Sequence, residues 1–482
     1  MISRWVVKFL GPFVFIVLQV LEPPTSLDES GFTLIGITLW MAIWWISEAV
    51  PIAVTALLPI FLFPLFDVVS ISETTQQYGH KYVFLYIGGF ILAIAIERWD
   101  LHKRIALQII KVIGSKASFL ILGFMIATAF LSMWISNTAT TVMMLPIAIA
   151  IANQVQSQGN ETKFFSKALM LSIAYSASIG GIATLIGTPP NLVFAGVIEN
   201  TYNLKISFFE WMKFGLPISI GLLFISWKYL TGFAFRMNHI HFSSGKKEID
   251  TMLRDLGKIS YEEKVVGIVF LLAALGWIFR GFLEEFVTGL DDTIIAICAA
   301  ILLFIIPARS RDRQLLTWDE ALKIPWGIII LFGGGMALAH GFVETGLANW
   351  IAGQINIFQG VSIFVLVILV TAMVNFLTEV TSNLATTAML LPILAPVALS
   401  FDVHPYALMI AVTLSASCAF MLPVATPPNA IVFGANYLKV SDMVKKGFLL
   451  NLISILIIAF AVYLLMPYVF NLESLSFPEA LK

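Results

Sequence analysis

The sequence predicts an all-α polytopic membrane protein, with about eleven transmembrane helices and two re-entrant hairpins arranged as an inverted repeat. Three observations lead to this fold class. Of 482 residues, 59% are hydrophobic and 12% are charged, about half the charged share of a soluble domain. Long uncharged apolar runs recur along the chain, and the mean hydropathy is +0.92. Two polar motifs inside these runs each occur twice.

The composition also excludes several classes of protein. The net charge is −1, so the chain has no basic footprint for a nucleic acid partner. The two cysteines, Cys298 and Cys418, lie in apolar stretches and form neither a disulfide framework nor a metal cluster. A β-barrel is disfavoured because its strands would alternate polar and apolar residues. Composition therefore predicts that the lipid bilayer surrounds the chain.

Apolar segments long enough to span the membrane follow one another along the chain. We expect spans at 6–21, 31–48, 50–66, 82–97, 168–199, 213–233, 264–281, 293–308, 326–345, 406–438 and 447–470. Lys and Arg crowd the connections 98–116, 236–264, 309–323 and 445–446, which places these on the cytoplasmic side. This alternation requires 117–155 and 361–400 to enter and leave on the same side. The N-terminus is then cytoplasmic and the C-terminus external.

Two motif pairs indicate an internal duplication. Residues 136–146 read SNTATTVMMLP and residues 382–392 read SNLATTAMLLP, an offset of 246. Residues 187–191 read GTPPN and residues 425–429 read ATPPN, an offset of 238. The predicted topology places the first Ser-Asn motif in a stretch flanked by cytoplasmic loops. It places the second Ser-Asn motif in a stretch flanked by external loops, so the two copies are inverted across the membrane. Inverted repeats with interrupted helices are typical of secondary transporters, whose sites lie at the repeat interface near the midplane.

The repeat divides the chain into five regions. Residues 1–81 are N-terminal scaffold helices, and 234–325 form a cytoplasmic loop with linking scaffold helices. The first repeat, 82–233, contains a hairpin at 117–155 and a broken helix at 168–199. The second repeat, 326–470, contains a hairpin at 361–400 and a broken helix at 406–438. Residues 471–482 form an external tail.

The motifs provide complementary ligands for ions. Each Ser-Asn pair is expected at a hairpin tip, where a helix begins and its free N–H groups can face an anion. Each Pro-Pro pair breaks a helix and frees the carbonyls before it, including those of Gly187 and Ala425, which suit Na⁺. Neither motif contains Lys or Arg. A bound anion would therefore need helix dipoles and co-bound cations, which predicts two cation sites flanking one anion site.

Two acidic residues have alternative interpretations. Glu379 is the only acid near a Ser-Asn motif, and its carboxylate is expected to act as a structural cap or, alternatively, as a proton site. Glu48 is expected at a cytoplasmic helix end.

No Ser–His pair, intramembrane Asp–Asp pair or His–Glu metal site is apparent, so a membrane enzyme is disfavoured. A channel would not need a cation-dependent anion site.

At these motifs the sequence resembles the divalent anion/sodium symporter family, the INDY-type dicarboxylate transporters. The resemblance rests on Ser136-Asn137-Thr138, on Ser382-Asn383 with its Ala-Thr-Thr tail, and on the two Thr-Pro-Pro-Asn breaks. It extends over nearly the whole chain. It implies a scaffold domain, a mobile transport domain, a homodimer and an elevator-type transport movement.

The resemblance also implies the roles of particular residues. The substrate-binding set comprises Ser136, Asn137, Thr138, Thr188, Ser382, Asn383, Leu384, Thr426 and Pro427. One Na⁺ site comprises Ser132, Ser136, Asn137 and the Gly187 carbonyl. The second comprises Thr378, Asn383 and the backbone of Thr381 and Ala425. The family's second motif often has Thr where this chain has Leu384, so hydrogen bonding on that side of the site is expected to be weaker.

The leading hypothesis is Na⁺-coupled uptake of a C4-type dicarboxylate such as succinate, malate or fumarate, with two or more Na⁺ as coupling ions. The alternatives are a dicarboxylate exchanger and a Na⁺/sulfate symporter of the same fold. An exchanger would need a fixed positive group, which the motifs lack. Short loops without a transit peptide favour a bacterial inner membrane.

Overall fold

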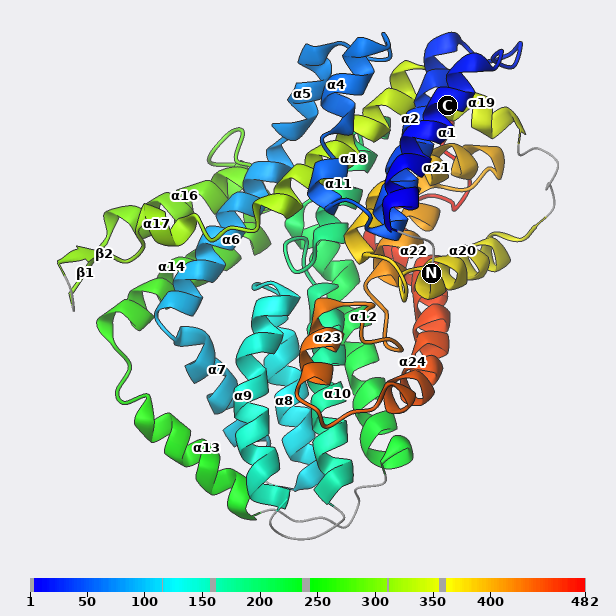
Figure 1. The fold of residues 1–482 in the computed structure, drawn as a ribbon. Helices are drawn as coiled ribbons and strands as arrows, with labels where there is room; N and C mark the ends of the chain where they lie inside the picture. The colour runs from blue at the N-terminus through cyan, green and yellow to red at the C-terminus, as the bar shows by residue number, and fades with distance from the viewer. Residues whose placement is uncertain are drawn as a thin grey trace.

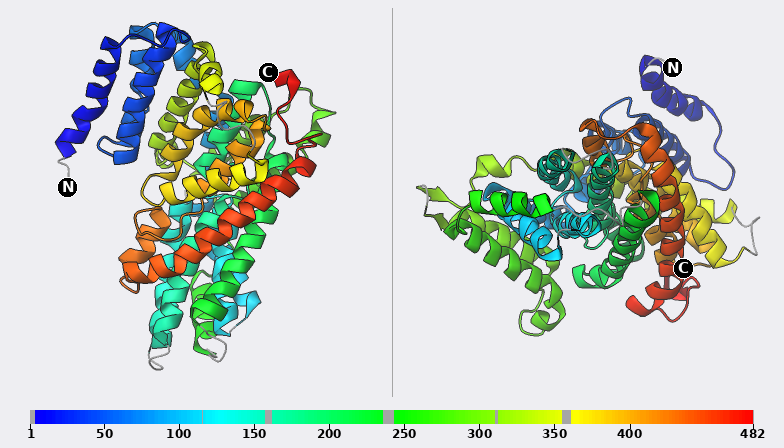
Figure 2. Two further views of the ribbon diagram at one scale, coloured as in Figure 1. Left: turned by 90° about the vertical axis from the view of Figure 1, so that its right-hand side faces the viewer. Right: turned by 90° about the horizontal axis from the view of Figure 1, so that it is seen from below.

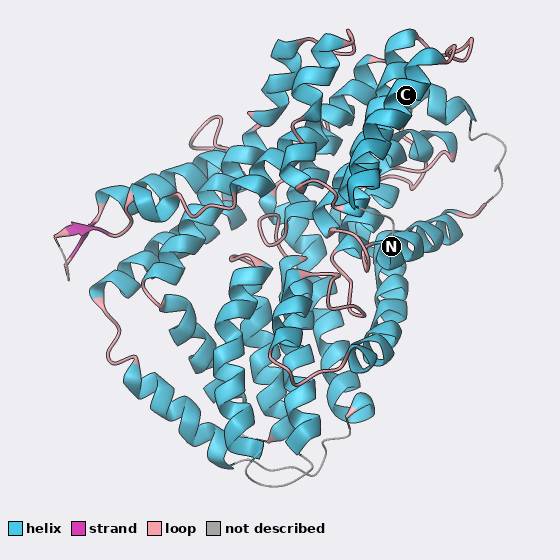
Figure 3. Ribbon diagram, viewed as in Figure 1, coloured by secondary structure: helices cyan, strands magenta, loops and turns pink. Residues whose placement is uncertain are grey.

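The computed structural model describes residues 4–114, 116–156, 162–235, 243–309, 312–354 and 361–481. Across these residues the chain is almost entirely helical (Figures 1 and 3). The strands there are a two-residue antiparallel pair, β1 (Pro307–Ala308) and β2 (Arg313–Gln314), in which Pro307 pairs with Gln314. The all-α prediction is confirmed.

The N-terminal part of the chain folds into five helices. They are α1 (Arg4–Val20), α2 (Glu29–Ser47), α3 (Ile52–Thr55), α4 (Leu58–Leu65) and α5 (Ile71–Tyr78). Helices α1 and α2 lie side by side away from the centre (Figure 2). The predicted span 50–66 is two short helices, because Pro59 lacks the N–H that would continue α3 and instead occupies the first turn of α4.

The region predicted as the first repeat contains an ordered series of helices. These are α6 (Lys81–Arg98), α7 (Leu101–Ile113), α8 (Ala117–Ser132), α9 (Asn137–Gln156), α10 (Thr162–Gly181), α11 (Pro189–Tyr202), α12 (Phe208–Lys228) and the π-helical turn η1 (Tyr229–Ala234). Helices α8, α9 and α10 form a bundle, with α7 packed against α8 (Figure 1). Both hairpin arms and both halves of the broken helix are thus helical.

The linking region carries α13 (Ser243–Asp255), α14 (Tyr261–Ile278), α15 (Arg280–Glu284), α16 (Asp292–Ile305) and α17 (Trp318–Ala321). Helix α14 begins at a capping box, in which Ser260 and Glu263 satisfy each other's backbone N–H groups. Helix α16 packs along α6 and α14. The Gly88 face of α6 touches α16 so closely that a Cβ there would lie 2.7 Å from Ala296 Cβ.

The region predicted as the second repeat has the same order of elements. They are α18 (Trp326–Glu344), α19 (Leu347–Gln354), α20 (Ile363–Leu377), α21 (Asn383–Ser400), α22 (Pro405–Ala416), α23 (Pro427–Gly434), α24 (Val440–Phe460), η3 (Ala461–Leu465) and α25 (Met466–Val469). The tail that follows contains the final turn η4 (Glu479–Leu481). Helices α7 and α19, α8 and α20, and α9 and α21 each begin 246 residues apart. Secondary structure therefore repeats with the motif offset.

Six helices in the described part of the chain are long and apolar enough to cross a membrane. They are Glu29–Ser47, Ile71–Arg98, Phe208–Ala234, Trp326–Glu344, Asn383–Ser400 and Val440–Val469. The other apolar helices there have 10–17 residues, and they include the hairpin arms Ala117–Ser132 and Ile363–Leu377 and the half-helix Pro405–Ala416. The count of about eleven spans stays a prediction.

The two regions predicted as repeats interlock through the second halves of their broken helices. Helix α11 packs against α21 and α22 of the other repeat, while α23 packs against α9 and α10. This exchange brings both hairpin tips and both helix breaks to the same place in the molecule. The exchanged helices therefore position the site.

Candidate functional site

The Ser-Asn motifs lie at the turns between the two arms of each hairpin. Helix α9 begins at Asn137 and α21 begins at Asn383. Ser136 Oγ accepts a hydrogen bond from the Ala139 N–H at 3.2 Å, which caps α9. The Ala-Thr-Thr tails have a structural role, because Thr141 Oγ1 donates to Asn137 O at 2.7 Å and Thr387 Oγ1 donates to Asn383 O at 2.8 Å.

The Thr-Pro-Pro-Asn motifs begin the second half of each broken helix. The prolines occupy the first two positions of α11 and α23, where no intrahelical N–H bond is needed. Asn191 Nδ2 donates to Gly181 O at 3.0 Å and to Thr184 O at 2.7 Å, across the first break (182–188). Asn429 Nδ2 donates to Ala419 O and Leu422 O at 3.1 and 3.0 Å, across the second break (417–426). Each asparagine therefore braces its break.

A cavity of about 440 Å³ lies between the two hairpin tips and the two breaks. All nine residues of the expected substrate-binding set line it: Ser136, Asn137, Thr138, Thr188, Ser382, Asn383, Leu384, Thr426 and Pro427. Helices from outside the motifs close the remaining side with Ile52, Tyr86 and Ile328. The structure thus gathers four sequence-distant motifs around one cavity.

The cavity has the electrostatics of an anion site without a fixed positive charge. Helices α9, α11, α21 and α23 all begin at its wall, so four positive dipole ends converge there. The free N–H groups come from α9 and α21, because α11 and α23 each begin with two prolines, which have none. Its lining includes no Lys or Arg, and its one charged side chain is Glu48. Glu48 caps the end of α2 in a left-handed conformation (φ 47°). Sequence reasoning placed Glu48 at a helix end and missed its position at this cavity.

Oxygen atoms cluster beside Asn137 at the first hairpin tip. Ser132 Oγ donates to Ala177 O at 2.7 Å and also contacts Asn137 Oδ1. Asn137 Oδ1 further lies 3.1 Å from Ala177 O and 3.3 Å from Gly187 O. One hydroxyl hydrogen cannot satisfy four converging oxygens. Such a cluster is satisfied either by turning the amide over, so that its nitrogen donates, or by a cation among the oxygens.

The second hairpin tip has the matching arrangement. Thr378 Oγ1 donates to Asn383 Oδ1 at 2.6 Å and to Ala416 O at 3.2 Å. Ala425 lines the cavity nearby. Thr381 differs from the other expected residues, because its hydroxyl donates to Leu377 O at 2.9 Å and contacts Thr386 Oγ1 at 2.6 Å, away from the cavity. The side chain of Thr381 therefore braces the tip, and only its backbone remains for an ion.

The oxygens of Ala177 and Ala416 were missed by sequence reasoning. Each lies within a Ser-Ala-Ser triplet upstream of a break, at 176–178 and 415–417. The matched triplets were a signal for these positions, but a backbone carbonyl carries no signature of its own in a sequence. In the described residues no three His, Cys, Asp or Glu side chains lie together as a metal site. Neutral oxygens of this kind suit a monovalent cation better than a divalent one.

Glu379 acts as a cap for the second break. Its Oε1 accepts from the N–H groups of Phe420 and Met421, both at 2.9 Å, and its Oε2 accepts from the Leu422 N–H at 2.9 Å. Asn451 Nδ2 of α24 donates to the same carboxylate at 2.7 Å. The carboxylate therefore satisfies three N–H groups that the interrupted helix leaves free. This geometry agrees with the cap interpretation of the sequence.

A family model and two similar proteins all describe sodium-dependent transporters. The family model of the sodium:sulfate symporter transmembrane region matches residues 3–471. A protein of Staphylococcus saprophyticus named sodium-dependent dicarboxylate transporter SdcS is 46% identical over 483 residues, which cover 98% of this chain and 93% of that protein. The protein of the same name from Staphylococcus aureus (strain USA300) is 46% identical over 475 residues, which cover 96% of this chain and 91% of that protein.

Solved structures share the fold at low sequence identity. MtrF of Neisseria gonorrhoeae matches with a TM-score of 0.58 and 13% identity, covering 95% of this chain and 98% of that chain. The YdaH transporter of Alcanivorax borkumensis matches with a TM-score of 0.56 and 13% identity, covering 97% of this chain and 98% of that chain. At this identity the likeness concerns the fold alone.

The family match extends over nearly the whole chain, and it confirms the resemblance found in the motifs. The protein is therefore an integral membrane transporter and not an enzyme. The chain belongs to the sodium:sulfate symporter family, the divalent anion/sodium symporters.

Proposed function

We propose that this protein is a symporter that couples Na⁺ influx to uptake of a C4-type dicarboxylate such as succinate, malate or fumarate. The observation that carries the proposal is the cavity itself, where four helix N-termini converge without a lysine or arginine. Helix dipoles alone offset only part of a dianion's charge. Na⁺ ions at the two oxygen clusters would supply the remainder, which makes cation binding a condition of anion binding.

The two Na⁺ sites proposed are those of the matched clusters. The first comprises Ser132, Ser136, Asn137 and the Gly187 carbonyl, with the Ala177 carbonyl added from the geometry. The second comprises Thr378, Asn383 and the backbone of Thr381 and Ala425, with the Ala416 carbonyl added. Because each cluster joins a hairpin tip to a helix break, bound Na⁺ would order both edges of the anion cavity.

The transport cycle follows from this coupling. Na⁺ binds first and orders the tips, the dianion then binds between Asn137 and Asn383, and the loaded domain crosses the membrane as an elevator within a homodimer. Electrogenic uptake requires more than two Na⁺ per dianion. The membrane proposed is the inner (plasma) membrane of a bacterium; the relatives from Staphylococcus support a bacterial plasma membrane.

Two alternatives use the same cavity. The first is sulfate, a dianion that hydroxyl groups and helix N-termini can also bind. The matching family model is that of sodium:sulfate symporters. An exchanger of dicarboxylates would need a fixed positive group, which the cavity lining lacks. The dicarboxylate is favoured by the relatives from Staphylococcus, which are named sodium-dependent dicarboxylate transporters.

The test is radiolabelled succinate uptake into proteoliposomes, under an inward Na⁺ gradient or an equal K⁺ gradient, with and without internal succinate. The proposal expects uptake that needs external Na⁺ and does not need internal succinate. Uptake that ignores Na⁺ but needs internal succinate would establish the exchanger. Uptake of sulfate and not succinate under the Na⁺ gradient would reassign the substrate.

A further inference from the structure

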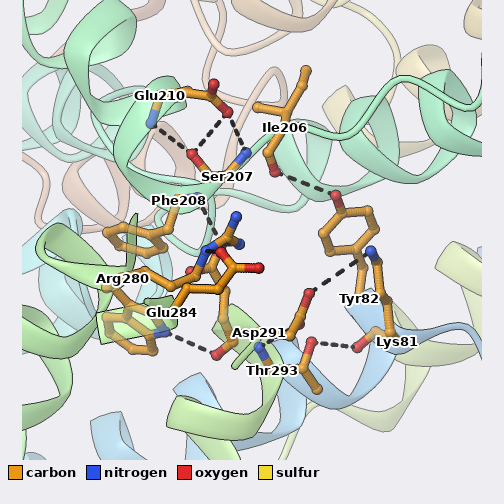
Figure 4. Close-up of polar contacts among 12 residues, drawn as sticks. Lys81, Tyr82, Ile206, Ser207, Phe208, Glu210, Arg280, Glu284, Asp291 and Thr293 are labelled. Carbon is orange, nitrogen blue, oxygen red and sulfur yellow. Dashed lines mark hydrogen bonds and ion pairs between the residues drawn. The ribbon is translucent and has the colours of Figure 1, made fainter. Parts of the chain in front are cut away.

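The start of α12 is held by side chains that are distant in sequence (Figure 4). Tyr82 of α6 donates its hydroxyl hydrogen to Ile206 O at 3.3 Å. The Phe208 N–H donates to Asp292 Oδ2 of α16 at 2.8 Å. The segment 206–208 thus connects the first repeat to the linking helices through its backbone.

Asp292 is the centre of this contact. It is 3% exposed, and besides the Phe208 N–H its Oδ2 accepts from Arg280 Nη1 of α15 at 3.0 Å. Trp277 Nε1 of α14 donates to the Asp292 carbonyl at 2.9 Å. A buried carboxylate with charged and backbone donors forms strong, geometrically demanding hydrogen bonds. Asp292 therefore fixes α12 against α14, α15 and α16 in one arrangement.

Aromatic rings extend the contact to the first hairpin tip. The ring of Phe208 stacks on that of Trp277, with centroids 4.6 Å apart and an interplanar angle of 16°. Trp134 of the tip stacks on both, with centroids 5.9 Å from Phe208 and 6.3 Å from Trp277. Phe208 and Trp277 are fully buried. Because Trp134 lies two residues before Ser136, this stack joins the lining of the anion cavity to α14.

We propose that Phe208 and Asp292 form a latch that holds α12 and the first hairpin against the linking helices α14–α16 in the state seen here, and that transport must open it. The proposal rests on the proposed function, because it requires α12 and the hairpin to move relative to α14–α16. Neither residue lines the anion cavity. They are positioning residues, which act on the movement through Trp134 and the hairpin tip and touch no substrate.

A second cavity makes the latch testable. It has a volume of about 240 Å³ and is lined by Ile206 and Asp292, together with Lys81, Lys205, Glu210 and Arg280. Charged side chains thus make up much of its lining. Ile206 is only 2% exposed in the latched state, so a thiol placed there would react slowly until the latch opens.

The experiment measures the labelling rate of Ile206→Cys by a water-soluble maleimide in purified full-length protein, with the exposed Cys298 replaced by Ser. The latch variants are Phe208→Ala and Asp292→Asn. Asp292→Asn keeps the shape of the side chain, so it still tests the latch if Phe208→Ala does not fold. Their controls are Phe209→Ala, at a neighbouring side chain that is 37% exposed, and Asp28→Asn, at an exposed aspartate that makes no side-chain cap bond to α2. A second reporter, Ser226→Cys, tests a buried position elsewhere in α12.

The latch variants are expected to accelerate labelling at Ile206→Cys about tenfold or more. Loss of a charge-assisted hydrogen bond or of a ring stack shifts the equilibrium between the latched and the open state by about that factor. The control variants and the Ser226→Cys reporter should not change. Equal labelling in latch and control variants would overturn the proposal, and a parallel rise at both reporters would overturn it by showing general loosening. The labelling needs no substrate, so a protein that ignores succinate but retains this pattern would refute the proposed function and leave the latch standing.

Discussion

Ser132 Oγ and Thr378 Oγ1 make the same two contacts in the two hairpins. Each lies within hydrogen-bond distance of the side-chain amide of the asparagine five residues later, and of a carbonyl in the half-helix that leads into the break. The carbonyls belong to Ala177 and Ala416. The two hydroxyls are 246 residues apart, the same offset as the Ser-Asn motifs. The two proposed Na⁺ sites are therefore chemically comparable, and removing either hydroxyl should have a similar effect on Na⁺ binding.

Ser132→Ala and Thr378→Val each remove one oxygen from a proposed Na⁺ site. We expect each to raise the Na⁺ concentration for half-maximal uptake about tenfold, the effect of losing one ligand or hydrogen bond of 1–2 kcal/mol. Uptake at saturating Na⁺ should change much less. The measurement is succinate uptake as a function of Na⁺ in proteoliposomes.

The chain offers matched controls for these variants. Ser172 and Thr371 are fully buried hydroxyls that bond only to carbonyls of their own helices, at 2.7 and 2.6 Å. Ser172→Ala and Thr371→Val should leave the Na⁺ dependence unchanged. If these controls shift it as much as Ser132→Ala and Thr378→Val do, the oxygen clusters are not the Na⁺ sites.

Glu379→Gln tests the cap against the proton-site interpretation. The amide retains one acceptor but turns an NH₂ group toward a backbone N–H, so at least one of the Phe420, Met421 and Leu422 donors loses its partner. A lost bond to a buried charged group costs about 1.5–3 kcal/mol. We expect a lower thermal midpoint and slower uptake, with the pH profile of uptake unchanged.

The control for this variant is Asn451→Ala, which removes one donor to the carboxylate and a second acceptor of the Phe420 N–H, and which leaves the carboxylate with its three backbone partners. It should be milder than Glu379→Gln in both measurements. A flattened pH profile in Glu379→Gln, at normal thermal stability, would instead establish Glu379 as a proton carrier.

Leu384→Thr tests the asymmetry of the anion cavity. Leu384 occupies the position that Thr138 holds in the first repeat, and its side chain is 6% exposed. A hydroxyl there should favour malate, which carries a hydroxyl, over succinate by about fivefold, the equivalent of one hydrogen bond of about 1 kcal/mol. Competition of each acid against labelled succinate measures the ratio.

Val424→Thr is the matched control, because Val424 lines the same cavity but is 78% exposed. A hydroxyl placed in open solvent should leave the ratio unchanged. An identical profile in Leu384→Thr and the unmodified protein would show that this side of the cavity does not contact the acid.

Gly180→Ala tests the close packing that holds the first break. A Cβ at Gly180 would lie 2.3 Å from Ala129 O of α8, which rigid backbone cannot accommodate. We expect loss of monodisperse protein in size-exclusion chromatography. Gly221→Ala in α12 has no heavy atom within 4 Å of the new Cβ and should be neutral or slightly stabilising. Comparable behaviour of the two variants would contradict this account of the α8–α10 contact.

Much of the helical organisation is local in origin and was therefore predictable. The prolines of the Thr-Pro-Pro-Asn motifs occupy the first turns of α11 and α23, as their missing N–H groups require. The uncharged runs around the Ser-Asn motifs form hairpin arms with the motif at the turn. The amphipathic helices α7 and α19 went unpredicted because they lie in charged or short connections that a search for apolar spans passes over.

The sequence by itself determined the fold class, the family and the nine motif residues that are found in the cavity lining, because helix breaks, dipoles and hydroxyls act within a few residues of their motifs. Only the tertiary structure decided which carbonyls complete the oxygen clusters and which N–H groups Glu379 caps. Those partners lie 38 to 72 residues away and are mostly backbone atoms. Backbone atoms are alike in every residue, so only the interlocking of α11 and α23 with the opposite repeat selects them.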